Sequence, residues 1–169
     1  MPARKQLSHL NASNQVQMVD VGDKAVTERS ASAQAIVILP TTCCAVLAAG
    51  GATRKGNVFE VARLAGIMAA KRTSELIPLC HQIPLAGVSV ELVLKGKRLL
   101  ISTTVRCRGQ TGVEMEALTA ASISALTVYD MLKAISHDVI IGPLELLTKD
   151  GGRSGRIDRR SATPKRSKK

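Results

Sequence analysis

Two charged pairs at the ends of one stretch, residues 110–137, are the first candidates for chemistry in this 169-residue chain. At the far end, Asp130 and Lys133 lie three positions apart, so their side chains share one face of a helix. Such a pair is by itself more often a surface salt bridge than a catalytic pair. The run VYDMLKA lies in apolar sequence, however, and partial burial beside an opposite charge shifts proton affinities as general acid–base catalysis requires. Asp130 and Lys133 are therefore a candidate acid–base pair.

The near end of the same stretch carries Glu114 and Glu116 on either side of Met115. In an extended segment both carboxylates would point the same way, and a carboxylate can accept hydrogen bonds from the N–H donors of a guanine edge. Fourteen residues separate Glu116 from Asp130, which is about 21 Å along a helix at roughly 1.5 Å per residue. A small substrate cannot span that distance. If both ends serve one site, another segment or a second subunit must join them, and we favour an oligomer with shared sites.

Two loops add further candidates. Lys55 lies in the basic segment ATRKG before a predicted helix start, where phosphate groups bind favourably. The glycine and lysine order of a P-loop is missing, and a solvated loop lysine is the commoner explanation. Cys80 and His81 lie in the proline-bounded loop IPLCHQIP. They could form a binding site, with Cys80 as an apolar wall and the His81 imidazole as a hydrogen-bonding group. A packed cysteine beside a surface histidine explains the pattern equally well.

The cysteine pattern argues against metal chemistry. Four cysteines are present without CxxC spacing, and no third and fourth ligands stand at a familiar distance, so we predict no metal site. Unpaired, reduced thiols are typical of cytosolic proteins, and we expect a cytoplasmic location.

Apolar periodicity predicts the elements that position these residues. The expected order is an edge strand at 15–21, a polar connection at 22–32, a buried strand at 33–39, helices at 40–49 and 57–75, an irregular loop at 77–84, a hairpin at 87–106, a long helix within 110–137 and a strand at 139–147. This order predicts an α+β, ferredoxin-like βαββαβ fold, an antiparallel sheet with helices packed on one face.

Length and composition predict one catalytic domain, residues 15–156, between a mobile N-terminal segment, 1–14, and a basic disordered tail, 157–169. The net charge of +11 is concentrated near the end, because residues 149–169 contribute nine basic and two acidic residues. We find no signal-peptide core and no run of ~20 apolar residues, so no membrane partner is expected. One Tyr, one Phe and no Trp leave little surface for stacking bases, so no specific nucleic acid is expected either.

Longer runs carry a family resemblance. KGNVFEVARLAGIMAAKRTSELIPLCH (55–81), TGVEMEALTAASISALTVYDMLKA (111–134) and GGRSG (151–155) closely resemble the molybdenum-cofactor biosynthesis protein C family, the cyclic pyranopterin monophosphate synthases, and MVDVGDKAVTER (18–29) is also similar. The resemblance implies a phosphorus–oxygen lyase that converts (8S)-3′,8-cyclo-7,8-dihydroguanosine 5′-triphosphate to cyclic pyranopterin monophosphate and diphosphate. It also implies a homohexamer, a trimer of dimers, with sites at subunit interfaces and no cofactor.

The resemblance also implies roles for individual residues. Asp130 matches the catalytic aspartate of the family, and Lys55 and Lys133 match lysines for acid–base steps and phosphate binding. The implied substrate-binding residues are Leu79, Cys80, His81, Met115 and Glu116, with Glu114, Lys71 and Arg29 as further pocket members. Two positions depart from many relatives, since Asn57 stands where Asp is common and Gln82 where some have Pro.

Two other functions stay open at this point. A basic ferredoxin-like module that binds RNA or DNA would fit the net charge and the element order, although the scarce aromatics and the charge in the tail argue against it. An inactive scaffold of the same family would be expected to have lost its charged residues, whereas Lys55, His81, Glu116, Asp130 and Lys133 are all present.

Overall fold

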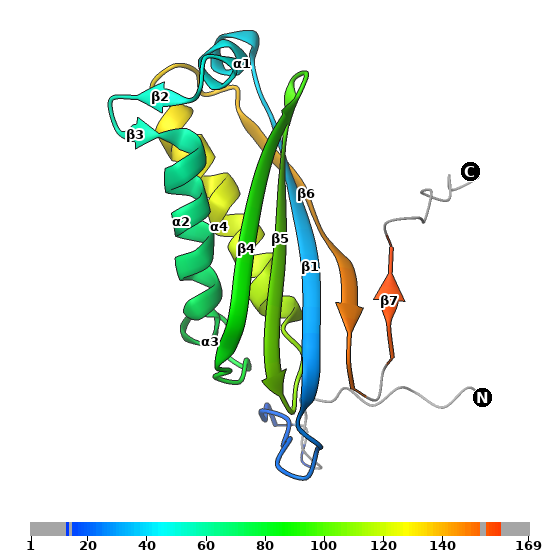
Figure 1. Cartoon of the computed structure of the whole chain (residues 1–169). Helices are drawn as coiled ribbons and strands as arrows, with labels where there is room; N and C mark the ends of the chain where they lie inside the picture. The colour runs from blue at the N-terminus through cyan, green and yellow to red at the C-terminus, as the bar shows by residue number, and fades with distance from the viewer. Residues whose placement is uncertain (1–12, 14, 153–154, 160–169) are drawn as a thin grey trace, which may run out of the picture.

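A computed structural model of the protein describes residues 13, 15–152 and 155–159. Its centre is an antiparallel sheet with strand order β4-β5-β1-β6-β7, and helices cover one face of it (Figure 1). The elements are β1 (Thr27–Ile38), α1 (Thr41–Ala48), β2 (Ala52–Thr53), β3 (Gly56–Asn57), α2 (Val58–Lys71), α3 (Thr73–Leu76), β4 (Leu85–Lys95), β5 (Arg98–Gly109), α4 (Glu114–Leu132), β6 (Ile140–Asp150) and β7 (Ile157–Asp158).

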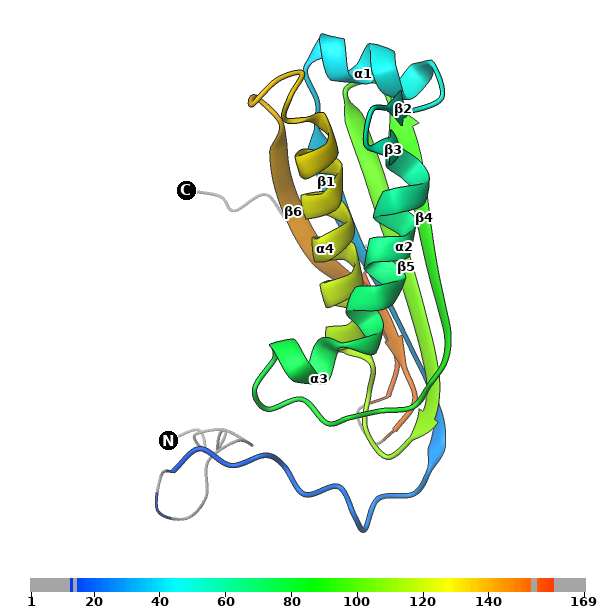
Figure 2. The same ribbon diagram turned by 90° about the vertical axis from the view of Figure 1, so that its left-hand side faces the viewer.

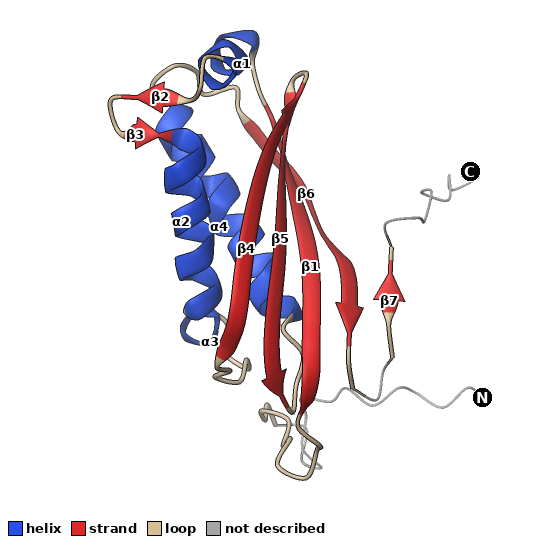
Figure 3. Ribbon diagram, viewed as in Figure 1, coloured by secondary structure: helices blue, strands red, loops and turns tan. Residues whose placement is uncertain are grey.

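The strand order confirms the predicted ferredoxin-like fold. Without the short elements the chain order is β1, α2, β4, β5, α4, β6, and β5 and β6 pair on either side of β1. Figure 3 shows the two long helices on the same face of the sheet. The hairpin β2–β3 lies at one end of this helical layer, and α3 lies at the other end (Figure 2).

The central strand β1 alternates between two environments, as a strand with one covered face requires. Ala31, Ala33, Ala35 and Val37 are buried in the core, while the residues between them are less buried. These buried side chains are small, and small side chains allow a helix to lie close to the sheet. The long helix α4 occupies that position.

Small residues also set the distance between α2 and α4. A Cβ built on Gly66 of α2 would lie 2.2 Å from Ser124 Oγ and 3.1 Å from the Ala120 carbonyl oxygen of α4. The buried Ser124 hydroxyl donates to the Ala62 carbonyl oxygen at 2.9 Å, so its hydrogen-bonding capacity is used inside the core. Close packing therefore holds α4, and the charged groups at its two ends, in a defined position.

Several predicted boundaries were wrong. Residues 15–21 form no strand beyond a bridge at Val16. The stretch 22–32 is a connection only as far as residue 26, because β1 begins at Thr27 and its polar side chains form cross-strand bonds, such as that between Ser32 Oγ and Thr148 Oγ1 at 2.5 Å. The predicted helix 57–75 is two helices, α2 and α3.

The terminal predictions fall mostly outside the described residues. The strand β7 lies at the start of the predicted tail, 157–169, and pairs with Thr148 and Lys149 of β6. The rest of that segment from residue 160, and the predicted mobile segment 1–14 apart from Ser13, lie outside what the structure describes.

Candidate active site

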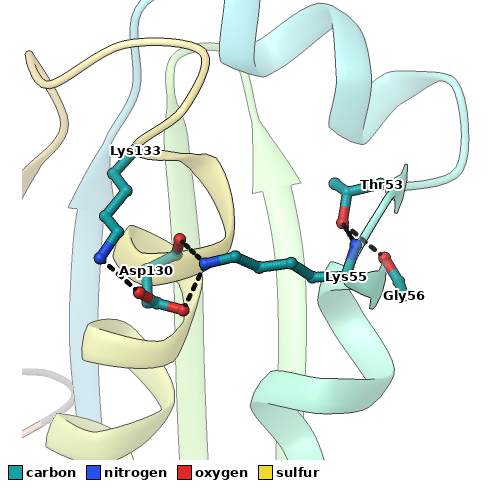
Figure 4. Close-up of polar contacts among 5 residues, drawn as sticks. All are labelled: Thr53, Lys55, Gly56, Asp130 and Lys133. Carbon is teal, nitrogen blue, oxygen red and sulfur yellow. Dashed lines mark hydrogen bonds and ion pairs between the residues drawn. The ribbon is translucent and has the colours of Figure 1, made fainter.

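Lys55, Asp130 and Lys133 meet at the C-terminal end of α4, and we call them the Lys–Asp–Lys cluster (Figure 4). Lys55 Nζ lies 2.8 Å from Asp130 Oδ2 and also donates to the Asp130 main-chain oxygen at 2.9 Å. Lys133 Nζ lies 2.8 Å from Asp130 Oδ1. The prediction that Asp130 and Lys133 share a helical face is confirmed, and the structure brings Lys55 to the same carboxylate.

The β2–β3 hairpin carries Lys55 to this position. Lys55 lies in the turn of the hairpin, where Thr53 Oγ1 accepts from the Lys55 main-chain N–H at 3.2 Å and donates to the Gly56 carbonyl oxygen at 2.8 Å. The Thr53 side chain therefore bonds to main-chain atoms on both sides of the turn, and these bonds fix the loop that carries Lys55 (Figure 4).

Asn57 anchors the base of the hairpin and caps α2. Its Oδ1 accepts from the N–H groups of Phe59 and Glu60 at 3.0 and 3.2 Å, and its Nδ2 donates to the Gly50 carbonyl oxygen at 2.7 Å. An aspartate here could cap the helix equally well but could not donate to Gly50. Asn57 thus occupies N–H groups at the start of α2, and the Lys55 side chain reaches α4.

The two lysines lower the pKa of Asp130 to about 2, with the larger effect from Lys133 and the smaller from Lys55. The same ion pairing raises the pKa of Lys133. The side chains of Asp130 and Lys133 are 54% and 47% exposed, so the partial burial predicted for them is wrong. Hydrogen bonding and charge cause the shift, not burial. In this state Asp130 is a weak base that orients two ammonium groups, and these groups can bind phosphate oxygens.

A first cavity, of about 320 Å³, lies at the N-terminal end of α4. It brings together the two segments predicted to bind substrate. Its lining is Val19, Val21, Lys24, Leu79, Cys80, His81, Ile83, Thr111, Gly112, Met115 and Glu116. Leu79, Cys80, His81, Met115 and Glu116 are therefore neighbours in space, although a β-hairpin separates them in the chain.

Glu116 is the buried carboxylate of the first cavity, with only 4% of its surface exposed. Burial raises the pKa of Glu116; a main-chain hydrogen bond opposes this, and the charge of Glu114 adds to it. Burial, together with the charge of Glu116, also raises the pKa of the Cys80 thiol. Cys80 is therefore a protonated thiol and a poor nucleophile at neutral pH. The chemical capacity of this cavity lies in its carboxylate, which can accept hydrogen bonds from N–H donors.

The expectation that Glu114 and Glu116 point the same way is wrong. Both lie in the first turn of α4, where residues two positions apart do not face each other. Glu116 lines the first cavity, whereas Glu114 lines a second one and pairs with Lys149 at 2.5 Å. The error arose because an extended segment was assumed where the helix already begins.

The segment 19–24 closes one side of the first cavity. His81 Nε2 lies 2.8 Å from the Val19 carbonyl oxygen, and Gln110 Nε2 donates to the Gly22 carbonyl oxygen at 2.7 Å. His81 therefore contacts the chain that forms this wall as well as the cavity itself. Its ring nitrogens face in two directions, so one can hold the wall while the other faces a ligand.

The second cavity, of about 680 Å³, adjoins the first, since Lys24, Thr111 and Gly112 line both. Lys24, Arg29 and Lys149 supply its cationic side chains, and Asp23 and Glu114 supply carboxylates. Only Arg29 and Glu114 were predicted.

Sequence reasoning missed two lysines of this second cavity. Lys24 lies in the run 18–29, five positions before Arg29, and that shared run could have identified it. Lys149 gave no such signal, because it was counted with the basic tail, whereas the structure places it in β6 opposite Glu114.

The predicted residues thus occupy two regions of one chain. The two adjoining cavities lie at the start of α4 and the Lys–Asp–Lys cluster lies at its end, about 21 Å away at the helical rise. Lys71 joins neither region, since it is exposed in the last turn of α2 and lines neither cavity. Within the described part of the chain, no three His, Cys, Asp or Glu side chains gather as a metal site, and no helix is long and apolar enough to cross a membrane.

The three cationic side chains of the second cavity suit a small anionic ligand. The chain belongs to the MoaC family, whose model matches residues 18–152. It is 55% identical, over 152 residues, to the cyclic pyranopterin monophosphate synthase of Chloroflexus aggregans, an alignment covering 89% of this chain and 92% of that protein. It is 53% identical to the cyclic pyranopterin monophosphate synthase of Chloroflexus aurantiacus, over 90% of this chain and 94% of that protein. The resemblance of the runs 18–29, 55–81 and 111–134 to this family is confirmed.

Proposed function

We propose that this chain uses the two cavities and the Lys–Asp–Lys cluster to convert (8S)-3′,8-cyclo-7,8-dihydroguanosine 5′-triphosphate to cyclic pyranopterin monophosphate, with release of diphosphate. This is the activity of a cyclic pyranopterin monophosphate synthase, a lyase of molybdenum cofactor biosynthesis, and the relatives at 53–55% identity carry that name. The observation that carries the proposal is a cation-lined cavity that adjoins a cavity with a buried carboxylate.

The two cavities suit the two ends of such a nucleotide. The base retains N–H donors on its pyrimidine edge, and Glu116 is a carboxylate acceptor in the first cavity. The triphosphate carries several negative charges, and Lys24, Arg29 and Lys149 provide cations in the second cavity. The ion pair with Glu114 holds Lys149 at the wall of this cavity.

The Lys–Asp–Lys cluster supplies the proton transfers. Opening the dihydroimidazole ring and closing the pyran ring move protons between carbon, nitrogen and oxygen. Lys133 is an ammonium acid whose pKa is raised, so it holds its proton until a basic group develops on the substrate. If a phosphate oxygen draws Lys55 or Lys133 away, the pKa of Asp130 rises toward its ordinary value, and Asp130 becomes a better base.

One chain cannot place its own cluster on its own cavities, because α4 separates them. A two-fold axis perpendicular to the middle of α4 would set the C-terminal end of α4 from one protomer beside the N-terminal end of α4 from the other. Each such pair would then contain two complete sites, each built from both protomers. We propose this arrangement as the repeating unit of a homohexamer, a trimer of dimers.

The outer surface of the helical layer supports contact between protomers. Val61, Leu64 and Met68 of α2 recur at helical spacing and are 37%, 58% and 45% exposed, and Leu126 of α4 is 54% exposed. Large apolar side chains grouped on one helix face are typical of a surface covered by a partner. The helix α2, which carries three of these side chains, packs beside α4 (Figure 2), so a two-fold contact on this helical layer would bury them.

The direct test is incubation of the purified chain with the cyclised nucleotide, with the pterin product followed by mass spectrometry and diphosphate by a coupled assay. Asp130→Asn should lower the rate by roughly 100- to 10,000-fold, the usual contribution of general acid–base catalysis, and leave assembly intact. Glu60→Gln is the matched control, because the Glu60 carboxylate forms an (i,i+3) ion pair with Arg63 of α2 and not with a lysine of the cluster. Wild-type rates in Asp130→Asn would remove Asp130 from the mechanism, and absence of both products with the wild-type chain would refute the proposed activity.

A further inference from the structure

Arg29 is the third residue of β1, and its side chain lines the second cavity. Its Nε donates to the Gly109 carbonyl oxygen at 3.3 Å, and its Nη2 donates to the Gln110 carbonyl oxygen at 3.4 Å. Both contacts are long, so they steer the guanidinium weakly by themselves. A guanidinium has five N–H donors in a planar fork, so these two bonds leave capacity for an anion in the cavity.

A pair of glycines passes against this guanidinium directly after β6. Gly151 and Gly152 have φ values of +96° and +75°, a backbone conformation that residues with a Cβ rarely adopt. A Cβ on Gly152 would lie 1.6 Å from Arg29 Nη1, 2.7 Å from Arg29 Cζ and 3.1 Å from Arg29 Nη2. The three nearest atoms therefore all belong to one guanidinium group.

The two glycines differ in what a side chain would disturb. A Cβ on Gly151 would lie 2.8 Å from Arg29 Cδ, but also 2.3 Å from the Glu28 carbonyl oxygen, a main-chain atom of β1 that cannot move without distorting the sheet. The three atoms nearest to a Cβ on Gly152 all lie at the far end of a flexible side chain, which can swing away. Gly151 is thus required by the fold, whereas Gly152 bears on where the Arg29 guanidinium lies.

We propose that Gly152 is a positioning residue for Arg29: its missing side chain leaves the space in which the guanidinium lies at the wall of the second cavity. This inference rests on the proposed function, in which Arg29 binds the phosphates of the nucleotide. Two features together fix the position of the guanidinium. The two weak main-chain hydrogen bonds hold one edge of its plane, and Gly152 leaves room for the opposite edge.

Gly155 offers a matched control. Its φ of +64° lies in the same left-handed region as that of Gly152, and no atom of the described residues lies within 4 Å of a Cβ built there. Alanine at Gly155 therefore carries the backbone strain of alanine at Gly152 without the collision. Any difference between the two variants reports the contact with Arg29.

The test compares Gly152→Ala, Gly155→Ala, Arg29→Ala and the double variant Arg29→Ala/Gly152→Ala in the full chain. Inorganic diphosphate is the binding probe, measured by calorimetry, and KM and kcat are measured with the cyclised nucleotide. We expect Gly152→Ala to weaken diphosphate binding and raise KM by roughly 10- to 100-fold, the range for hydrogen bonds to charged groups, while Gly155→Ala leaves both unchanged. The double variant should be no weaker than Arg29→Ala alone, because both changes remove the same contact.

Other outcomes overturn the inference in distinguishable ways. If Arg29→Ala weakens diphosphate binding but Gly152→Ala matches Gly155→Ala, Gly152 does not position Arg29 and the proposed function is unaffected. If the two losses add in the double variant, Gly152 acts by another route. If Arg29→Ala itself changes neither diphosphate binding nor KM, Arg29 does not bind the phosphates, and this inference fails together with that part of the proposed function. If Gly152→Ala folds poorly, Gly152→Ala and Gly155→Ala are compared in an Arg29→Lys background, where the branched guanidinium is absent. Gly152→Ala should fold normally there. Poor folding in that background too would indicate a structural role for Gly152 and overturn the inference.

Discussion

Mixing inactive subunits tests the claim that a site combines the cavities of one protomer with the Lys–Asp–Lys cluster of another. His81→Ala damages the first cavity, and Asp130→Asn damages the cluster, and each variant alone should be inactive. Suppose that the two variants are co-expressed in equal amounts and assemble at random. The protomer that supplies the cavity then has an intact cavity in half of the sites, and the protomer that supplies the cluster has an intact cluster in half of the sites. About one quarter of the sites are then complete, so the mixture should recover about 25% of the wild-type rate.

The structure also provides the matched control for this experiment. Lys55 and Asp130 contact each other within one chain, at 2.8 Å. Substitution of Lys55 and substitution of Asp130 therefore both damage the cluster, which is the same half of a shared site. A mixture of Lys55→Ala with Asp130→Asn should recover nothing, although its subunits exchange just as freely.

The assay is the initial rate of diphosphate release from tandem-tagged complexes, purified so that both variants are present in each complex. A recovery near one quarter for the His81 and Asp130 variants, with none for the Lys55 and Asp130 variants, supports the shared site. No recovery in either mixture, after mass spectrometry shows both chains in the complexes, would refute it, because the cluster and the cavities would then have to act within one chain or at separate sites.

Three further predictions concern the charged groups. The pKa of Asp130 is lowered to about 2, so its ion pairs stabilise the folded state at a pH above its unfolded pKa near 3.8, and this stabilisation is lost as the pH falls from about 4 to 2. A carboxyl-carbon NMR titration of Asp130 should give a midpoint near 2, and Lys133→Met should move that midpoint back toward 3.8. An unchanged midpoint in this variant would contradict the role of Lys133. Burial raises the pKa of Glu116, so the ionised carboxylate lowers the stability of the fold as the pH rises above its unfolded pKa near 4.5. Glu116→Gln should therefore raise the urea midpoint of unfolding at pH 7 and lower turnover. A lower urea midpoint would show that the ionised group stabilises the fold. Deletion of residues 160–169, which removes five basic and no acidic residues and spares β7, should leave kcat and KM unchanged and weaken the salt-dependent binding of polyanions, whereas lost turnover would place this segment in the site.

The fold was largely predictable because its elements are recorded in local patterns. Alternation in the hairpin β4–β5, the capping residue Asn57 and the small-residue helix α4 each act over a few neighbouring residues, and each prediction was confirmed. The start of β1 was not predictable in this way. Its first residues are polar, and only pairing with β5, and from Ser30 onward also with β6, makes a strand of them.

The chemical types at the site were also identifiable from the chain, whereas their grouping was not. The sequence by itself determined the charged residues at both ends of α4 and, from the helical rise, that about 21 Å must separate Glu116 from Asp130. Only the tertiary structure decided which side chains meet. It joined Lys55 to Asp130 through the hairpin β2–β3, turned Glu114 and Glu116 toward different cavities, and placed Lys149 opposite Glu114. The physical reason is that a charge pair between distant segments depends on where packing leaves each backbone, and no local pattern records that position.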